Sequence, residues 1–310
     1  MYKRFFFLLG LLLAGVLVTS ADTIVIHSNT TTQNTSSSST DEQQTSGVVG
    51  SFNSTQQNND IVIQNNVVTS NQQNSVNVQN VEVTPGKEQQ KTVKIKLTHK
   101  NNGQPVTDDA LQEMHTKKLH VLIINNRLTD YSHVHPTPLI DQPGYYVFNW
   151  EPQSNDYYRL WVDIVPVETK QQEYVVADLT PPQLQPTIDK TLVQKNTVNG
   201  LTFAITFDNP LHINKASMGT LTVTDKNGQP VTQLEPIMGA YAHIVGFYED
   251  FHSIMHIHPM GKEPSKPSDR GGSVLQFHIE PKHAGFVKLF VQVVYQGKEI
   301  YVPFGVEVKE

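Results

Sequence analysis

The sequence contains no cysteine among its 310 residues. This absence excludes disulfide-stapled small folds, thiolate zinc sites, iron–sulfur clusters, cysteine nucleophiles and lipoprotein anchors, because each of them requires a cysteine sulfur. A transition-metal site in this chain would therefore use histidine, methionine or carboxylate ligands.

Positive charge is also scarce. The chain has 23 Lys and Arg against 29 Asp and Glu, a formal net charge of −6, and no Lys or Arg lies between Arg4 and Lys87. A nucleic-acid-binding surface must neutralise phosphates with basic side chains. We therefore expect no nucleic-acid partner.

Long apolar runs are limited to one segment, Phe5–Val18, which follows Lys3 and Arg4 and precedes the small residues 19–21. This order is typical of a secretory signal peptide, and the run is shorter than the ~20 residues that span a bilayer. We predict a signal peptide at residues 1–21, export to the periplasm, the cell surface or the medium, and no membrane insertion after cleavage.

A polar tract follows. Ser, Thr, Asn and Gln make up 40 of the 64 residues from 22 to 85. Such a composition buries too little apolar surface to offset the entropy of ordering, which predicts a mostly disordered tract at residues 22–79. The alternating stretches 60–68 and 75–83 have strand character, so a self-associating or surface-attached β segment is the alternative.

The part of the chain that follows the polar tract contains one sequence unit in two copies. The run Asn-Gly-Gln-Pro-Val-Thr begins at Asn102 and again at Asn227. A pattern of three histidines and a proline recurs at an offset of 123, and a later block recurs at an offset of 129. The difference predicts an insertion in the second copy within 261–272.

Each copy reads as β structure with almost no helix. Short β-branched and aromatic stretches alternate with turn signals such as Asn102-Gly103 and Asn227-Gly228. We predict an all-β fold with two tandem immunoglobulin-like sandwiches at residues 80–178 and 187–310, joined by a proline-rich linker at 179–186.

The repeated histidines form the pattern His-x12-His-x-His-Pro, at His120, His133, His135 and at His243, His256, His258. If the residues between the first two histidines form a hairpin centred on 126–127 or on 249–250, the first histidine lies directly across from the second. The third lies two residues further along, on the same face of the sheet. Each copy is thus predicted to gather three imidazoles.

Three neutral imidazoles bind copper, zinc, nickel or iron and leave a position open for another ligand. Methionine thioethers favour Cu(I). Met238 and Met260 are further candidate ligands in the second copy, whereas Met255 is predicted to point into the core. His115 is the extra candidate in the first copy, which reads as histidine-rich. We predict a copper ion in each copy, with zinc as the alternative.

The stretches Leu119–Pro136, Ala242–Pro259 and Val302–Val308 resemble bacterial exported immunoglobulin-like β-sandwich domains with a His-x12-HxHP motif, similar to YtkA-like proteins. The resemblance covers most of residues 90–310. It implies copper or other heavy-metal handling.

The leading hypothesis is an exported, non-catalytic metal-binding protein that stores, buffers or delivers copper, with a metal-delivery or cell-surface protein as partner. One alternative is a surface adhesion protein in which the sandwiches are spacers and no metal has a role. Another is a copper oxidoreductase. No hydrolase or nucleotide-binding motif of the common kinds is present.

Overall fold

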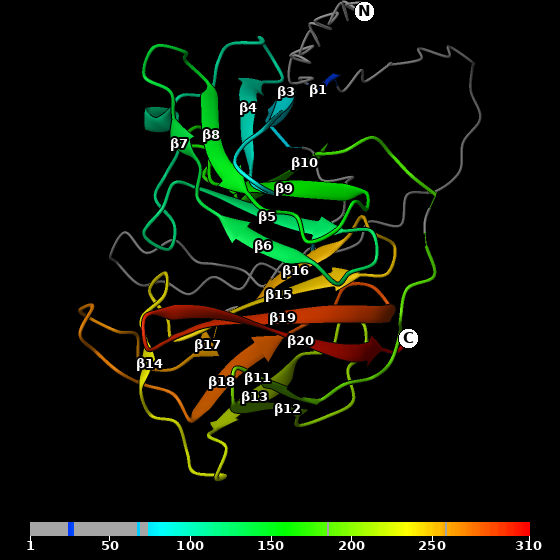
Figure 1. Cartoon of the computed structure of the whole chain (residues 1–310), viewed down its shortest axis with the longest axis vertical. Coiled ribbons are helices and arrows are strands. Elements are labelled where there is room, and N and C mark those ends of the chain that lie inside the picture. Colours follow the sequence, from blue (N-terminus) through cyan, green and yellow to red (C-terminus); the bar gives the residue numbers. More distant parts are fainter. Residues whose placement is uncertain (1–23, 28–66, 69–73, 185, 258) are drawn as a thin grey trace, which may run out of the picture.

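The computed structural model describes residues 24–27, 67–68, 74–184, 186–257 and 259–310. These residues form two β-sandwiches in tandem and one short 3-10 helix, η1 (Asp108–Ala110) (Figure 1). The all-β, immunoglobulin-like fold predicted from the repeat is therefore confirmed. None of the helical structure in the described residues is long and apolar enough to cross a bilayer. The predicted signal peptide lies outside the described residues.

The first sandwich consists of two antiparallel sheets. Their strand orders are β1-β3-β4-β8-β7 and β10-β9-β5-β6. The strands are β1 (Ile24–His27), β3 (Val76–Pro85), β4 (Lys91–His99), β5 (Leu119–Asn125), β6 (Tyr131–Val134), β7 (Thr137–Pro138), β8 (Tyr145–Trp150), β9 (Tyr158–Ile164) and β10 (Glu173–Asp178). Alternate residues of the two inner faces, such as Val93, Ile95, Val121 and Leu160, form its core.

The second sandwich repeats this plan. Its sheets have the orders β11-β12-β13-β18-β17 and β14-β19-β15-β16-β2, and β20 also pairs with β19. The strands are β2 (Val67–Val68), β11 (Lys195–Val198), β12 (Leu201–Phe207), β13 (Ser217–Thr224), β14 (Leu234–Glu235), β15 (His243–Tyr248), β16 (Ile254–Ile257), β17 (Pro259–Met260), β18 (Val274–Ile279), β19 (Gly285–Tyr295) and β20 (Lys298–Val308). The connection from β17 to β18, residues 261–273, is longer than the equivalent connection at 139–144, which confirms the predicted insertion.

The polar tract contributes to both sandwiches. Strand β3 begins at Val76, so the first sandwich starts before the predicted boundary at residue 80. Strand β1 pairs with β3, and β2 pairs with β16 of the second sandwich. The rest of the predicted disordered tract, residues 22–23, 28–66 and 69–73, lies outside the described residues.

The two sandwiches pack against each other through one sheet from each. Figure 1 shows β9, β5 and β6 of the first lying over β16, β15 and β19 of the second. Between them lies an apolar cluster that contains residues of both. Its members include Trp161 and Tyr131 from the first sandwich and Phe247 and Phe290 from the second, with ring centroids 5.0–6.1 Å apart. Strand β5 is buried at every position because one of its faces lines the core and the other lines this interface.

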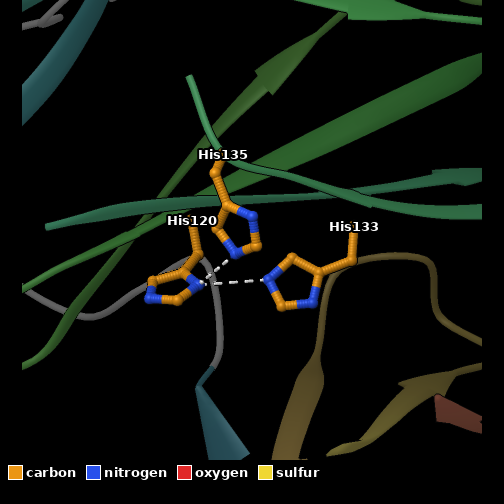
Figure 2. A group of neighbouring side chains, drawn as sticks. All are labelled: His120, His133 and His135. Atoms are coloured by element: carbon orange, nitrogen blue, oxygen red, sulfur yellow. Dashed lines mark hydrogen bonds between the residues drawn. The ribbon is translucent and has the colours of Figure 1, made fainter. Parts of the chain in front are cut away.

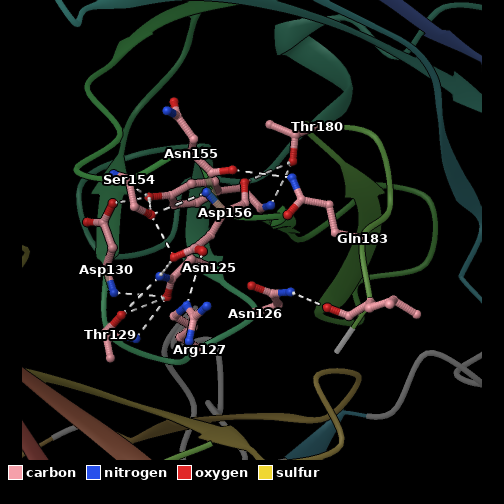
Figure 3. A network of polar contacts seen from close by, with 12 residues as sticks. Asn125, Asn126, Arg127, Thr129, Asp130, Ser154, Asn155, Asp156, Thr180 and Gln183 are labelled. Carbon is pink, nitrogen blue, oxygen red and sulfur yellow. Dashed lines mark hydrogen bonds and ion pairs between the residues drawn. The ribbon is translucent and has the colours of Figure 1, made fainter. Parts of the chain in front are cut away.

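A polar network holds the β5–β6 turn (Figure 3). The Oδ1 atom of Asn125 accepts the backbone N–H groups of Thr129 and Asp130 at 2.8 and 3.0 Å, and its Nδ2 donates to Asp156. Arg127 also donates to Asp156, at 3.1 Å. An asparagine that caps a turn in this way fixes where the chain reverses, and so sets the register of the hairpin.

Candidate metal centre

Three histidines of the first repeat come together on the sheet face that meets the second sandwich. His120 lies on β5, His133 on β6, and His135 directly after β6. His120 Nδ1 is 3.2 Å from His133 Nε2 and 3.1 Å from His135 Nε2, and Figure 2 shows the three rings pointing toward one another. His120 and His133 are buried, with 0% and 6% of their surface exposed. The predicted convergence of these imidazoles is therefore present.

Hydrogen bonds to the far sides of the rings fix which nitrogens face the centre. His120 Nε2 lies 2.9 Å from the backbone oxygen of Met114, which can only accept, so a neutral His120 carries its proton on Nε2. Its Nδ1 lone pair then points at the other two rings. An outer hydrogen bond of this kind orients a metal-ligating histidine.

Gln292 of the second sandwich performs the same function for His133. Its Oε1 atom lies 3.0 Å from His133 Nδ1, while its Nε2 donates to Glu299 at 3.1 Å and to Tyr301 at 2.9 Å. The amide oxygen is thus the atom turned toward His133, and it accepts the Nδ1 proton. Nε2 of a neutral His133 therefore presents its lone pair to the centre.

Met238 of the second sandwich adds a sulfur atom. Its Sδ lies 3.2 Å from His135 Nε2. The centre therefore gathers three imidazole nitrogens and one thioether sulfur, of which two nitrogens have their lone pairs directed inward. A single proton can satisfy one pair of these atoms, whereas a metal ion can bind all of them.

The nitrogen spacing matches that of metal ligands. Two nitrogens bound at 2.0–2.1 Å to a tetrahedral ion lie about 3.3 Å from each other. The two distances from His120 Nδ1, 3.1 and 3.2 Å, are within 0.2 Å of this value. All three ligand atoms of the group lie within 4.8 Å of one another. These residues could hold a transition-metal ion.

His135 connects the centre to solvent. It is half-buried and lines a surface hollow of about 360 Å³ together with Glu113, Lys117 and Thr137. Burial is the main cause that lowers the pKa of His135 to about 4, and the neighbouring His120 and Lys117 lower it further. The ring is therefore neutral near pH 7, which is the form that binds metal. An ion could reach the centre through this hollow.

The hairpin register differs from the prediction by two residues. His133 lies opposite Leu122 rather than His120, and in the second copy His256 lies opposite Val245 rather than His243. The last pair before the first turn is Ile124 with Tyr131, so the turn is centred one residue later than polarity alone suggested. A shift of two leaves every side chain on its predicted face, which is why the first triad still forms.

The other histidines and methionines discussed from the sequence lie in different places. His243 is 1% exposed and lies in the same interface, with its ring 6.2 Å from that of His133. Met255 is in the core of the second sandwich, as predicted. Met260 is 53% exposed on β17. His258 and the side chain of His256 lie outside the described residues.

The structure places the two extra candidate ligands, Met238 and His115, beside histidines of the other copy. Met238 contacts His135 of the first copy, and the His115 ring lies 5.4 Å from that of His243 of the second. These contacts occur because the two histidine-bearing sheets face each other, so the segments that carry Met238 and His115 each reach the other sandwich. Sequence reasoning also missed Gln292, although a glutamine within the apolar strand β19 is a recognisable signal.

Replacing Gln292 with leucine tests its role in the centre. Because His133 then loses the acceptor that fixes its tautomer, we expect metal affinity to fall about 10–100-fold, the usual effect of an outer-layer change. Isothermal titration calorimetry with Zn(II) measures this loss. Glu299→Gln serves as the control, because Glu299 is one hydrogen bond further from the His133 ring than Gln292. This variant should retain affinity within a few fold. Equal affinities for wild type and Gln292→Leu would contradict the assigned role.

Comparison with known proteins identifies the family. A family model described as a domain of unknown function, DUF8832, matches residues 69–179 and 196–310. The two matches cover more than half of the chain, which therefore belongs to this family, and each corresponds to one sandwich. A search of the curated proteins finds no match.

Comparison with solved structures finds matches of low identity and low TM-score. Domains 4 and 5 of the S-layer protein SbsC are 14% identical with a TM-score of 0.18, over 49% of this chain and 65% of that one. The D0-D1 domain of intimin is 10% identical with a TM-score of 0.21, and the match covers 73% of this chain and 92% of that one. An alpha-2-macroglobulin from Escherichia coli is 10% identical with a TM-score of 0.22, and the match covers 71% of this chain and 19% of that one. The chain thus spans less than two thirds of the first and third of these proteins.

Proposed function

We propose that this member of the DUF8832 family is an exported protein that binds a transition-metal ion, most favourably copper, between its two sandwiches. The observation that supports the proposal best is the convergence of His120, His133 and His135 with Met238. A mixed set of imidazole and thioether ligands suits copper better than zinc, because thioethers favour Cu(I). The resemblance of the sequence to YtkA-like proteins points the same way.

The role that we propose is storage, buffering or delivery of the ion rather than catalysis. His135 is half-buried and borders a surface hollow, so a partner protein could approach one ligand while the others stay buried. An ion held in this way can pass to a partner by exchange of ligands. Export is inferred from the signal-peptide pattern of residues 1–21.

Metal titration of the purified protein tests the proposal. We expect stoichiometric binding of Cu(I) in competition with a chromogenic chelator, and at least a 100-fold loss of affinity in the triple variant His120→Ala/His133→Ala/His135→Ala. The control is His99→Ala/His212→Ala/His283→Ala, which removes the same number of imidazoles elsewhere and should bind as wild type does. If the two triple variants bind Cu(I), Cu(II) and Zn(II) equally, the protein does not use this centre, and the adhesion alternative gains support.

A further inference from the structure

A buried carboxylate lies beside the histidine triad, in the same sheet. Asp163 of β9 is directly opposite His120 of β5 in the strand register, and 0% of its surface is exposed. Residues opposite each other on neighbouring antiparallel strands point to the same face of the sheet, with Cβ atoms about 4.5–5.5 Å apart. Asp163 therefore faces the interface with the second sandwich, next to a ligand of the proposed centre.

An amide and a phenol of the same sheet hold this carboxylate in place. Gln172 Nε2 donates to Asp163 Oδ1 at 2.8 Å and to the Tyr174 hydroxyl oxygen at 2.8 Å. Because the hydroxyl oxygen accepts that bond, its own proton is left to be donated to Asp163. Burial is the main cause that raises the pKa of Tyr174, and the charge and hydrogen bond of Asp163 raise it further. Both donors are neutral, so these bonds leave the negative charge of Asp163 in place.

The second sandwich has the same row of residues with its charge further out. Gln292 is opposite His243 as Asp163 is opposite His120, and Tyr301 is the next residue of the row. The carboxylate here is Glu299, two residues before the tyrosine, at the position that holds an amide in the first sandwich. It accepts from Gln292 Nε2 at 3.1 Å and from the Tyr301 hydroxyl at 2.9 Å, and it is exposed. Amide and carboxylate have thus exchanged places between the two rows.

The position of the buried charge matches the position of the triad. Moving a carboxylate out of water is costly, and a nearby cation offsets the cost. The three imidazoles beside Asp163 and the thioether of Met238 are neutral ligands, so an ion among them keeps its whole charge. Of the two equivalent rows, the one that carries His120 has the buried carboxylate, and the one that carries His243 has its carboxylate at the surface.

We propose that Asp163 is the counter-charge of the metal centre and determines how tightly the centre holds divalent ions relative to Cu(I). This inference rests on the proposed function and adds a residue that acts on the ion through its charge, without being a ligand. The attraction between a carboxylate and an ion is proportional to the charge of the ion, so it doubles from Cu(I) to Cu(II) or Zn(II). The thioether of Met238 favours Cu(I). Asp163 opposes that preference, so that the centre can hold copper in both oxidation states.

Asp163→Asn tests the counter-charge, because it removes the charge and keeps the shape of the side chain. Competition titrations of the full chain with Zn(II) and with Cu(I) measure the two affinities. We expect the Zn(II) affinity to fall about tenfold or more, and the Cu(I) affinity by about the square root of that factor, since the lost attraction is half as large. The reduction potential of the bound copper should rise. Asp163→Glu keeps the charge and should restore the ratio of the two affinities.

The double variant Asp163→Gln/Gln172→Glu tests the position of the charge independently. It copies the arrangement of the second sandwich and moves the carboxylate one strand away from His120 without changing the net charge. It should lose Zn(II) affinity relative to Cu(I), as Asp163→Asn does, and either variant decides the question if the other fails to fold. The control Glu299→Gln removes an exposed carboxylate and should keep the wild-type ratio.

Equal losses for Zn(II) and Cu(I) in the folded variants, or no loss for either ion, would overturn the role of Asp163. In that case binding that still depends on His120, His133 and His135 leaves the proposed function standing. A wild type that binds no metal removes both.

Discussion

Phe247→Ala is expected to lower the free energy of unfolding by about 3–5 kcal/mol, the usual cost of removing a buried phenylalanine side chain. Phe247 is 1% exposed and belongs to the cluster between the sandwiches. Its ring lies 5.3 Å from that of Tyr131 and 5.5 Å from that of Trp161. Truncation removes contacts that hold the two histidine-bearing sheets together, so metal affinity should fall as well. Urea unfolding followed by tryptophan fluorescence, together with metal titration, measures both effects.

Phe203→Ala is the matched control. Phe203 is 0% exposed but lies in the core of the second sandwich, away from the cluster between the domains. We expect a similar loss of stability in this variant with little change in metal affinity while it remains folded. Equal metal affinities in the two alanine variants would show that docking of the sandwiches does not set the geometry of the centre.

Metal binding is expected to stabilise the fold strongly. An ion that binds only the folded chain adds about 2.7 kcal/mol when its free concentration is 100 times Kd. For a folded region of this size, the gain corresponds to a rise of about 5–10 °C in Tm. Differential scanning calorimetry with Cu(I), before and after addition of a competing chelator, measures the change.

The triple variant lacking His120, His133 and His135 provides the control for this stabilisation. Its Tm should not rise with Cu(I) to the extent seen in the wild type. Met238→Leu should show an intermediate rise, because it keeps the three imidazoles and loses the sulfur. An unchanged Tm in wild-type protein with copper demonstrably bound would mean that the ion does not favour the folded state, and that the centre does not link the sandwiches.

The local chemistry of the site was largely predictable from the sequence. Alternation of side chains along a strand placed His120, His133 and His135 on one face, and this result survived an error of two residues in the register. The exact register was not predictable, because it depends on how Asn125 caps the turn rather than on the polarity of the turn residues.

Repeat analysis could not predict that Met238 and His115 lie beside histidines of the other sandwich. A repeat shows which residues correspond, but it does not show which outer faces meet. A partial signal was present in β5 and β15, whose residues are buried on both faces. Strands without a polar side are typical of sheets covered on both faces. This pattern could have predicted that the histidine-bearing sheets lie inside the molecule.

The interface between the two sandwiches resembles the interface of a symmetric, isologous dimer, although both halves belong to one chain. In a symmetric dimer of a single repeat, the two halves of the interface would be identical, and any substitution would appear twice. Fusion removes that constraint. His115 stands where the other repeat has Met238, and Asp163 pairs with His120 in the sheet at the position where Gln292 pairs with His243. Covalent linkage of the repeats has thus allowed a carboxylate and an amide, and an imidazole and a thioether, to occupy equivalent positions that symmetry would have required to be alike.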